Sequence, residues 1–137
     1  MADLADLKVL VVDDMEDLVR FHKRWMGLEH IKVVSSLTGG GGVEQLRQNP
    51  DVDVILLDLV LPDMDGIQVF AEMRKLKPDV PVIVYSGHND WLAKWSSQPN
   101  LKTLNKPFFL PTLKNMVGEM TGRVTESPKK QESQQAL

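Results

Sequence analysis

Five short runs of apolar residues recur along the chain, and each is a candidate β-strand. These runs occupy positions 8–12, 31–34, 54–57, 82–85 and 101–104. The third run, Val54 to Leu57, contains no polar side chain, and an unbroken aliphatic run of this length is typical of a strand buried on both faces. Asp58 follows it directly. A charge at the end of a buried strand costs free energy unless a partner stabilises it.

Between these runs, apolar residues recur every three or four positions, which indicates amphipathic helices. We assign the first apolar stripe to Leu18, Phe21 and Trp25, widened by Val19 and Met26, and we expect Asp13 or Asp14 to cap this helix. A later helix carries apolar residues spaced by three, namely Ile67, Phe70, Met73 and Leu76. Further helices are expected at 90–97 and from about 111 to 122, where a proline stands at the first-turn position and a glycine at the end.

Four consecutive glycines, Gly39 to Gly42, precede a helix that we expect to begin only at Val43 and to end at Gln48. Glycine costs roughly 1 kcal/mol per residue inside a helix, which favours a late start or a mobile first turn. A phosphate-cradling loop is not expected here, because no lysine follows the glycines and they do not follow the first strand.

The alternation of strands and helices predicts a parallel sheet with helices on both faces. Polar residues follow four of the predicted strands, namely Asp13, Asp14, Asp58, Ser86 and Lys106. In sheets of this kind, ligands bind beyond the carboxyl ends of the strands. Because parallel strands bring these ends to one edge, we expect the five side chains to converge there.

Length, composition and charge narrow the possible functions. The chain has 137 residues, of which 42% are hydrophobic and 26% charged, as is typical of one globular domain. It contains no cysteine, which excludes disulfides and cysteine-ligated metals. The sequence has no signal-peptide pattern and no apolar run near the ~20 residues of a membrane span, so a cytoplasmic location is expected. The net charge of −3 argues against direct nucleic-acid binding.

The composition changes near the C-terminus. Residues from Arg123 onward are almost entirely polar and offer little to a hydrophobic core. We therefore expect residues 6–121 to form the folded domain and residues 122–137 to form a disordered polar tail.

Three converging carboxylates repel one another, by about 4 kcal/mol for a pair at ~4 Å and an effective dielectric constant of about 20. A divalent cation relieves this repulsion, and ligands that are all oxygen favour Mg²⁺ or Mn²⁺ over zinc. With the ammonium of Lys106 and the hydroxyl of Ser86, such a site would stabilise a transferring phosphoryl group. Asp58 would then be the nucleophile that forms an acyl phosphate.

These residues resemble the receiver domain of bacterial two-component response regulators. The resemblance covers about residues 6 to 121. It rests on Val11-Val12-Asp13-Asp14, on Asp58 followed by Leu61-Pro62-Asp63-Met64-Asp65-Gly66, on Ser86-Gly87 and on Lys106-Pro107-Phe108. It implies a flavodoxin-like α/β fold, a doubly wound five-stranded parallel sheet.

The resemblance also implies roles for individual residues. Asp58 would accept a phosphoryl group from a sensor histidine kinase or a histidine phosphotransfer protein, and Asp13, Asp14, Asp58 and the backbone carbonyl of Val60 would hold the metal. Ser86 would swing towards the phosphate, Lys106 would pair with it, and the Lys106–Pro107 bond would be cis. Such a domain would catalyse only its own phosphorylation and dephosphorylation. Because no output domain follows, the chain would act as a stand-alone receiver that docks to a protein or passes the phosphoryl group on.

Several positions depart from the pattern of that family. Thr103 stands where an aromatic residue commonly turns inward on activation, which puts a tyrosine-type switch in doubt. Trp91 and Trp95 are expected either to form a docking patch or to pack into the core. Val60 and His88 would flank the path of the hydrolytic water and set the lifetime of the phosphoryl group.

Three other functions fit the same architecture. A phosphatase of the dehalogenase type needs a second carboxylate two residues after its nucleophile. Val60 occupies that position here, which argues against this function. A flavin or dinucleotide binder needs a glycine- or hydroxyl-rich first loop that receives phosphate. The corresponding loop here, Asp13-Asp14-Met15-Glu16, is acidic and would repel phosphate, which argues against this function. The remaining alternative is a pseudo-receiver, a protein-binding module that never takes phosphate.

Overall fold

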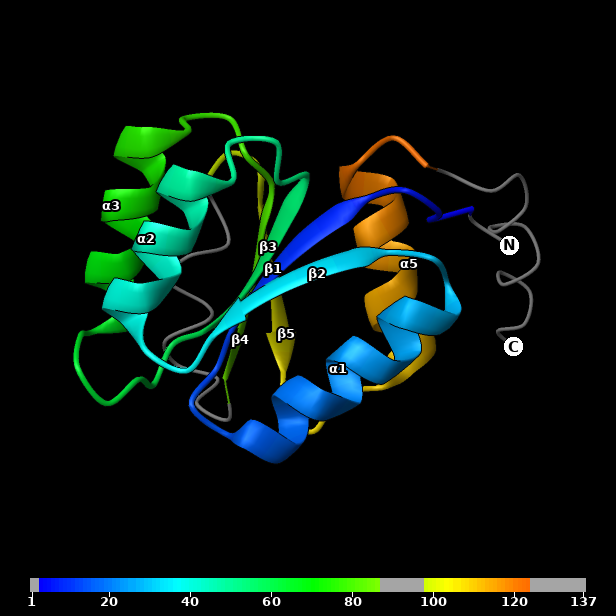
Figure 1. Cartoon of the computed structure of the whole chain (residues 1–137), viewed down its shortest axis with the longest axis horizontal. Coiled ribbons are helices and arrows are strands. Elements are labelled where there is room, and N and C mark those ends of the chain that lie inside the picture. The colour runs from blue at the N-terminus through cyan, green and yellow to red at the C-terminus, as the bar shows by residue number, and fades with distance from the viewer. Residues whose placement is uncertain (1–2, 87–97, 124–137) are drawn as a thin grey trace.

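The computed structural model describes residues 3–86 and 98–123, in which a five-stranded parallel sheet lies between two layers of helices (Figure 1). The strands are β1 (Lys8–Val12), β2 (Lys32–Ser36), β3 (Val54–Asp58), β4 (Val82–Ser86) and β5 (Leu101–Asn105). Their order across the sheet is β2-β1-β3-β4-β5, so β3 is central. This order is the flavodoxin-like one, and the predicted fold class is confirmed.

Helices α2 (Gly39–Gln48) and α3 (Gly66–Leu76) cover one face of the sheet, and α1 (Glu16–Leu28) and α5 (Leu110–Met120) cover the other (Figure 1). The helix expected at 90–97, including Trp91 and Trp95, lies outside the described residues, as do residues 124–137. Among the described helices, none combines the length and the apolar character needed to cross a membrane.

Each face of the sheet buries its own hydrophobic cluster. Towards α2 and α3, the core includes Leu10, Ile55 and Leu57 from the strands and Val69 and Met73 from α3. Towards α1 and α5, the core includes Trp25 and Met26 from α1, Ile83 and Tyr85 from β4 and Leu113 and Val117 from α5. Every residue of β3 and β4 is buried, as the unbroken apolar runs predict.

The buried faces of α1 and α3 agree only in part with the predicted stripes. In α1 the predicted residues Val19, Trp25 and Met26 are buried, but His22 is buried as well and Phe21 is 41% exposed. In α3 the buried residues are Gly66, Val69, Phe70 and Met73, whereas Ile67 and Leu76 are exposed. A helix has 3.6 residues per turn, so the α3 series, which is spaced strictly by three, drifts around the axis and leaves the buried face.

The start of α2 also corrects the sequence prediction, because the helix begins at Gly39 rather than Val43. Thr38 caps it by accepting a hydrogen bond from the Gly41 N–H. A Cβ atom at Gly42 would lie 2.6 Å from Cγ2 of Val12, and one at Gly39 would lie 2.6 Å from Cγ2 of Val69. The glycines let α2 approach the sheet and α3 closely, and this packing offsets their low helix propensity.

The predicted cap of α1 is wrong in its detail. The N-cap residue is Met15 and its side chain makes no cap hydrogen bond, although the Met15 N–H donates to Oδ1 of Asp13 at 2.9 Å. The predictions for α5 are confirmed: Pro111 lies in its first turn, Leu113 and Val117 are buried, and Gly122 follows with a φ of 76°.

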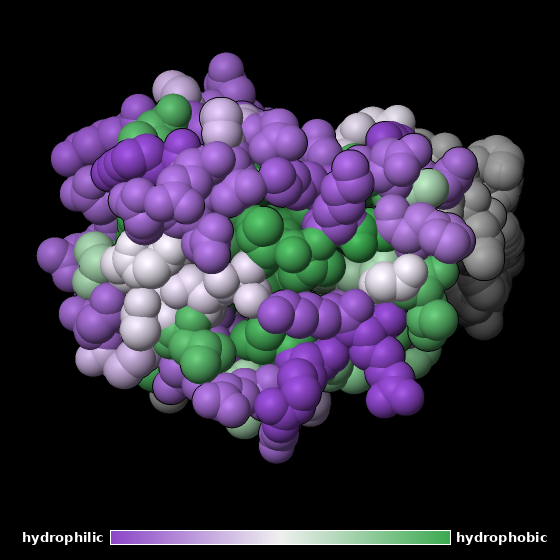
Figure 2. Space-filling view, viewed as in Figure 1, coloured by the Kyte–Doolittle hydropathy of each residue, from purple (hydrophilic) through white to green (hydrophobic). Residues whose placement is uncertain are grey.

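Strand β2 forms one edge of the sheet, and its Val33 and Val34 are only half buried. It extends two residues beyond the predicted 31–34, to Ser36. In the view of Figure 2, hydrophobic surface gathers in the middle of this side of the molecule, over β2 and between polar side chains. The opposite edge is β5.

Candidate functional site

The structure brings together the three carboxylates that the sequence singled out. Val12 pairs with Leu57 in the sheet, so Asp13 and Asp58 follow at neighbouring strand ends. Asp13, Asp14 and Asp58 each offer one oxygen atom, and these atoms all lie within 4.8 Å of one another. Asp13 and Asp58 are buried, whereas Asp14 is exposed. The predicted convergence of these residues is therefore present in the fold.

Lys106 reaches the same cluster from the end of β5. Its Nζ lies 3.2 Å from Oδ2 of Asp58 and 3.8 Å from Oδ2 of Asp13. The peptide bond between Lys106 and Pro107 is cis, as expected. The backbone N–H of Lys106 donates to the carbonyl oxygen of Ser86 at 2.9 Å, which ties the end of β5 to the end of β4. One ammonium group thus partly offsets the negative charge of the cluster.

The ionisation of Asp58 reflects opposing influences. Burial raises the pKa of Asp58 above its usual range, because an anion loses solvation there. The backbone N–H of Val60, which donates to Oδ1 at 3.1 Å, and the charge of Lys106 act in the opposite direction. The two carboxylate oxygens therefore have different neighbours, a peptide N–H on Oδ1 and an ammonium on Oδ2.

The positions of Ser86 and Val60, two further predicted site residues, follow from where the backbone passes the end of the sheet. Tyr85 is the sheet partner of Asp58, so Ser86 stands one residue further along the neighbouring strand, where it is buried. Val60 lies two residues beyond Asp58, and the residue is 53% exposed. His88, which was predicted to flank the site with Val60, lies outside the described residues.

Tyr85 was not among the predicted site residues, yet it is fully buried and its hydroxyl donates a hydrogen bond to Oδ2 of Asp13. Its ring also lies beneath Lys106, whose Nζ is 4.6 Å from the ring centroid. Burial and the negative charge of Asp13 raise the pKa of Tyr85 far above its usual range, so the hydroxyl remains a donor. A signal was available, because a buried tyrosine needs a partner for its hydroxyl and this one directly precedes Ser86.

His22 was also missed, and it lies at the centre of an aromatic group beneath the site. Trp25 donates its Nε1–H to Nδ1 of His22 at 3.0 Å, which places the imidazole proton on Nε2. The His22 ring stacks on Phe108 with a centroid separation of 5.6 Å and meets Tyr85 edge-on. Among the described residues, Nε2 has no hydrogen-bond partner. Burial lowers the pKa of His22 from 6.5 to about 4, so the ring is neutral.

Asp63, in the loop that follows Asp58, contacts the glycine-rich start of α2. Its two carboxylate oxygens accept hydrogen bonds from the N–H groups of Gly39, at 2.8 Å, and Gly40, at 2.9 Å. These hydrogen bonds lower the pKa of Asp63, because they stabilise its anionic form. The contact joins the loop after β3 to the N-terminus of a helix, where negative charge is favourable.

Thr103 lies in β5 as the sheet partner of Val84 and is half buried. No aromatic ring is present at this position, so the expected departure from the tyrosine-type switch residue stands. The aromatic ring beside Lys106 is instead supplied by Tyr85 on β4.

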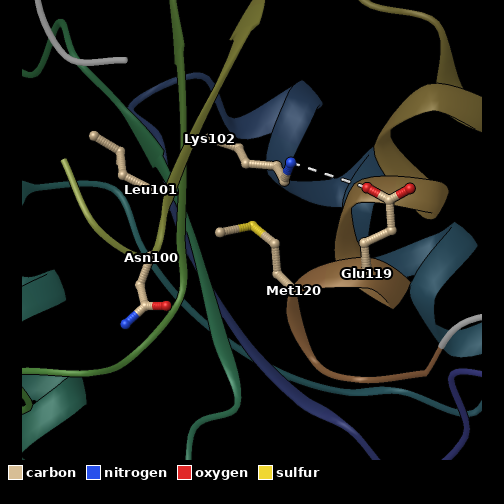
Figure 3. Close-up of a pocket in the computed structure, with 5 residues that line it drawn as sticks. All are labelled: Asn100, Leu101, Lys102, Glu119 and Met120. Atoms are coloured by element: carbon tan, nitrogen blue, oxygen red, sulfur yellow. Dashed lines mark ion pairs between the residues drawn. The ribbon is translucent and has the colours of Figure 1, made fainter. Parts of the chain in front are cut away.

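A hollow of about 290 Å³ lies at the other end of β5, between Asn100, Leu101 and Lys102 and the end of α5 (Figure 3). Lys102 points towards Glu119 across it, at 4.0 Å, and Met120 lines it beside them. Because this hollow lies at the start of the strand, it is separate from the acidic cluster at the carboxyl ends. It contains one solvent-exposed ion pair and is not a candidate for the main site.

Residues 9–118 match the family model described as the response regulator receiver domain. The chain belongs to this family. The transcriptional regulatory protein GlrR of Escherichia coli is 35% identical over 80 residues, which are 58% of this chain and 18% of that protein. The receiver chain thus corresponds to a small part of that relative.

Solved receiver structures share the fold. A response regulator receiver domain protein from Clostridium thermocellum superposes with a TM-score of 0.80 at 22% identity, over 85% of this chain and 95% of that one. A complex of CheX and CheY with BeF₃ and Mg²⁺ from Borrelia burgdorferi superposes with a TM-score of 0.75 at 21% identity, over 84% of this chain and 89% of that one. These likenesses concern the receiver fold alone.

The donor set of the receiver site fits a hard divalent cation. Three carboxylates of mixed burial supply only oxygen atoms, and the cluster carries more negative charge than Lys106 offsets. Such sites favour Mg²⁺ or Mn²⁺, which prefer oxygen ligands and retain bound water. The chemistry of the residues therefore agrees with the metal that the sequence predicts.

Proposed function

We propose that this receiver accepts a phosphoryl group on Asp58 and signals through the resulting change in its surface. The observation that carries the proposal is the geometry around Asp58. A buried carboxylate has an ammonium group 3.2 Å from one oxygen, a peptide N–H 3.1 Å from the other, and two further carboxylates close enough to share a cation. This arrangement places fixed positive charge where a phosphoryl group would bring negative charge.

In the proposed reaction, a carboxylate oxygen of Asp58 attacks the phosphorus of a phosphohistidine. The new O–P bond forms as the P–N bond breaks, and the leaving imidazole keeps the electron pair and takes up a proton. Lys106 then pairs with a phosphoryl oxygen, and Ser86 donates a hydrogen bond to another. Positioning and electrostatic stabilisation supply most of the catalysis in such transfers.

Asp13, Asp14, Asp58 and the backbone carbonyl of Val60 would hold Mg²⁺, or Mn²⁺ in its place. When bound, the cation supplies positive charge that neutralises phosphoryl oxygens as they approach the acidic cluster. The contribution of the chain is to hold the carboxylates together. Asp13 is fixed by the Met15 N–H, and Asp58 by the Val60 N–H.

The phosphoryl donor in this proposal is a sensor histidine kinase or a histidine phosphotransfer protein, and the output is docking to a protein or onward phosphoryl transfer. Residues 6–121 form the receiver in this proposal, and residues 122–137 are a polar tail. The domain acts in the cytoplasm. It turns over no separate substrate and promotes only its own phosphorylation and dephosphorylation.

Incubation with acetyl phosphate and Mg²⁺, followed by intact mass measurement, tests the proposal. Wild type is expected to gain one phosphoryl group, whereas Asp58→Asn and wild type in EDTA are expected to gain none. Asp63→Asn is a matched control, because it removes a carboxylate five residues away and should leave the adduct in place. If wild type takes up no phosphoryl group from acetyl phosphate or from a phosphorylated phosphotransfer protein, the chain is instead a phosphorylation-independent binding module.

A further inference from the structure

Tyr85 stands apart from the other residues at the site, because it contacts the acidic cluster without being one of the residues that would bind metal or phosphate. It lies on β4 beside Asp58 and is fully buried. Its hydroxyl donates to Oδ2 of Asp13, the same oxygen that lies 3.8 Å from Nζ of Lys106. The other oxygen of Asp13 accepts the Met15 N–H. Both oxygens of this buried carboxylate therefore have a donor from the chain.

A hydrogen-bond donor and a cation draw on the same electron density of a carboxylate oxygen. A carboxylate that already accepts a hydrogen bond from a hydroxyl group is stabilised as an anion, and it gains less when a cation binds. The effect is strong here, because Asp13 is completely buried and is screened little by solvent. The hydroxyl of Tyr85 thus stabilises the negative charge of Asp13 as a bound cation would, but to a smaller extent.

The Tyr85 ring has little freedom to turn away from Asp13. It meets His22 at a centroid distance of 6.1 Å and Phe108 at 6.0 Å, in both cases edge-on. On the side facing the site, Nζ of Lys106 lies 4.6 Å from the ring centroid. The hydroxyl is held against Asp13 by packing from α1 and from the residue after Pro107.

We propose that Tyr85 is a positioning residue that holds Asp13 in its place and lowers the affinity of the site for a divalent cation. This inference rests on the proposed metal site. The hydroxyl of Tyr85 sets the Mg²⁺ concentration at which that site fills. The hydroxyl stabilises Asp13 when the cation is absent, so the cluster tolerates a buried carboxylate at low Mg²⁺. The cost is weaker binding of the cation.

Tyr85→Phe removes the hydroxyl and keeps the ring that supports Lys106. Calorimetry with Mg²⁺ alone is expected to show that this variant binds the cation about tenfold more tightly than wild type, since hydrogen bonds to charged groups are worth roughly this factor. Val117→Ala is the control, because it weakens the same hydrophobic cluster without touching the carboxylates. Its Mg²⁺ affinity is expected to equal that of wild type. Equal or weaker binding by Tyr85→Phe would overturn the proposal.

Stability measurements separate this role from simple packing. In EDTA, both variants are expected to unfold at lower urea concentration than wild type. Saturating Mg²⁺ should restore Tyr85→Phe more than it raises wild type, because tighter binding gives more stabilisation by mass action. Val117→Ala should gain only what wild type gains. A Tyr85→Phe variant that gains no more than wild type contradicts the proposal.

A measurement on the wild-type chain needs no variant. The chain contains one tyrosine, so ¹³C labelling of tyrosine at the ring carbon that bears the hydroxyl gives one resonance, from Tyr85. This resonance is expected to move on addition of Mg²⁺, with the midpoint seen by calorimetry, and a resonance that stays fixed while Mg²⁺ binds would refute the contact. If wild type is phosphorylated by acetyl phosphate but Tyr85→Phe binds Mg²⁺ as wild type does, only the role of Tyr85 fails. If wild type binds no Mg²⁺, the proposed metal site fails as well.

Discussion

The two faces of the sheet are built on different principles. Towards α2 and α3, close approach dominates: aliphatic side chains meet glycines, and an added Cβ at Gly42 would lie 2.6 Å from Val12. Towards α1 and α5, the core contains Trp25, His22 and Tyr85: Trp25 donates a hydrogen bond to His22, and Tyr85, which meets the His22 ring edge-on, donates one to Asp13. The α2 and α3 face depends on a close steric fit between helices and sheet. The α1 and α5 face brings a buried polar side chain into contact with a carboxylate of the candidate site.

This difference predicts how each face responds to change. Substitutions in the hydrophobic core of the α2 and α3 face should alter stability without altering how stability depends on pH. Substitutions of the buried polar residues on the α1 and α5 face, His22 and Tyr85, should alter the dependence of stability on pH or on metal, because these side chains interact with charged or ionisable groups. The following substitutions test that contrast, in order of decreasing effect.

The largest expected effect concerns His22 and acid. Its pKa is about 4 in the folded chain, against 6.5 as the ordinary value, so the unfolded chain binds more protons between these values. Stability is therefore present above about pH 6.5 and is lost as pH falls towards 4, by on the order of 3 kcal/mol at about 1.4 kcal/mol per pKa unit. His22→Asn, which can still accept from Trp25, should be less stable at pH 7 but should lose less stability between pH 7 and 4.5. Urea unfolding at several pH values measures both.

Asp58 contributes with the opposite sign to the dependence of stability on pH. Burial raises its pKa in the folded chain, so its protonation in acid stabilises the fold. The double variant His22→Asn/Asp58→Asn should therefore show a flatter profile than either wild type or Asp58→Asn alone. A profile that keeps the wild-type slope after removal of His22 would show that another group carries the acid sensitivity.

The next effect concerns the close approach of α2. Gly42→Ala should lower the free energy of unfolding by about 1–2 kcal/mol, because overpacking against Val12 exceeds the gain in helix propensity. Gly27→Ala is the matched control in α1, where an added Cβ would meet nothing within 4 Å. That variant should be more stable by about 0.5–1 kcal/mol. Chemical denaturation at pH 7 and at pH 5 should give the same difference for each variant.

The smallest expected effect concerns Asp63, which joins the loop after β3 to the start of α2. Asp63→Asn should modestly destabilise the fold at pH 7, because a charged acceptor for the Gly39 and Gly40 N–H groups is lost. The lowered pKa of Asp63 means that this stability is present above pH 3.8 and is lost as pH falls below it. The amide resonances of the two glycines should move in that range in wild type and stay fixed in the variant. The same movement in both would assign it to another carboxylate.

The sequence was sufficient to predict the sheet and the gathering of charged residues at one edge. Unbroken aliphatic runs such as Val54 to Leu57 indicate buried strands. Parallel strands then bring Asp13, Asp58 and Lys106 to one edge of the sheet by topology alone. These predictions needed only local patterns and the rule that ligands bind at the carboxyl ends of strands.

The remaining features depend on contacts between distant parts of the chain. The start of α2 could not be inferred, because low helix propensity argued against it and the favourable fit of Gly39 and Gly42 arises only once the neighbouring strand and helix are in place. His22 was hidden for a related reason. Phe21 is the more hydrophobic neighbour, yet the rotation of α1 exposes Phe21 and buries His22.

Chemical localisation of the phosphoryl group determines whether Asp58 is its acceptor. Borohydride reduces an aspartyl phosphate to homoserine, which peptide mass mapping can place in the chain. After treatment with acetyl phosphate and Mg²⁺, homoserine is expected at position 58 and should be absent when EDTA replaces Mg²⁺. Homoserine at position 13, 14 or 63 instead, or at none, would show that Asp58 is not the phosphoryl acceptor.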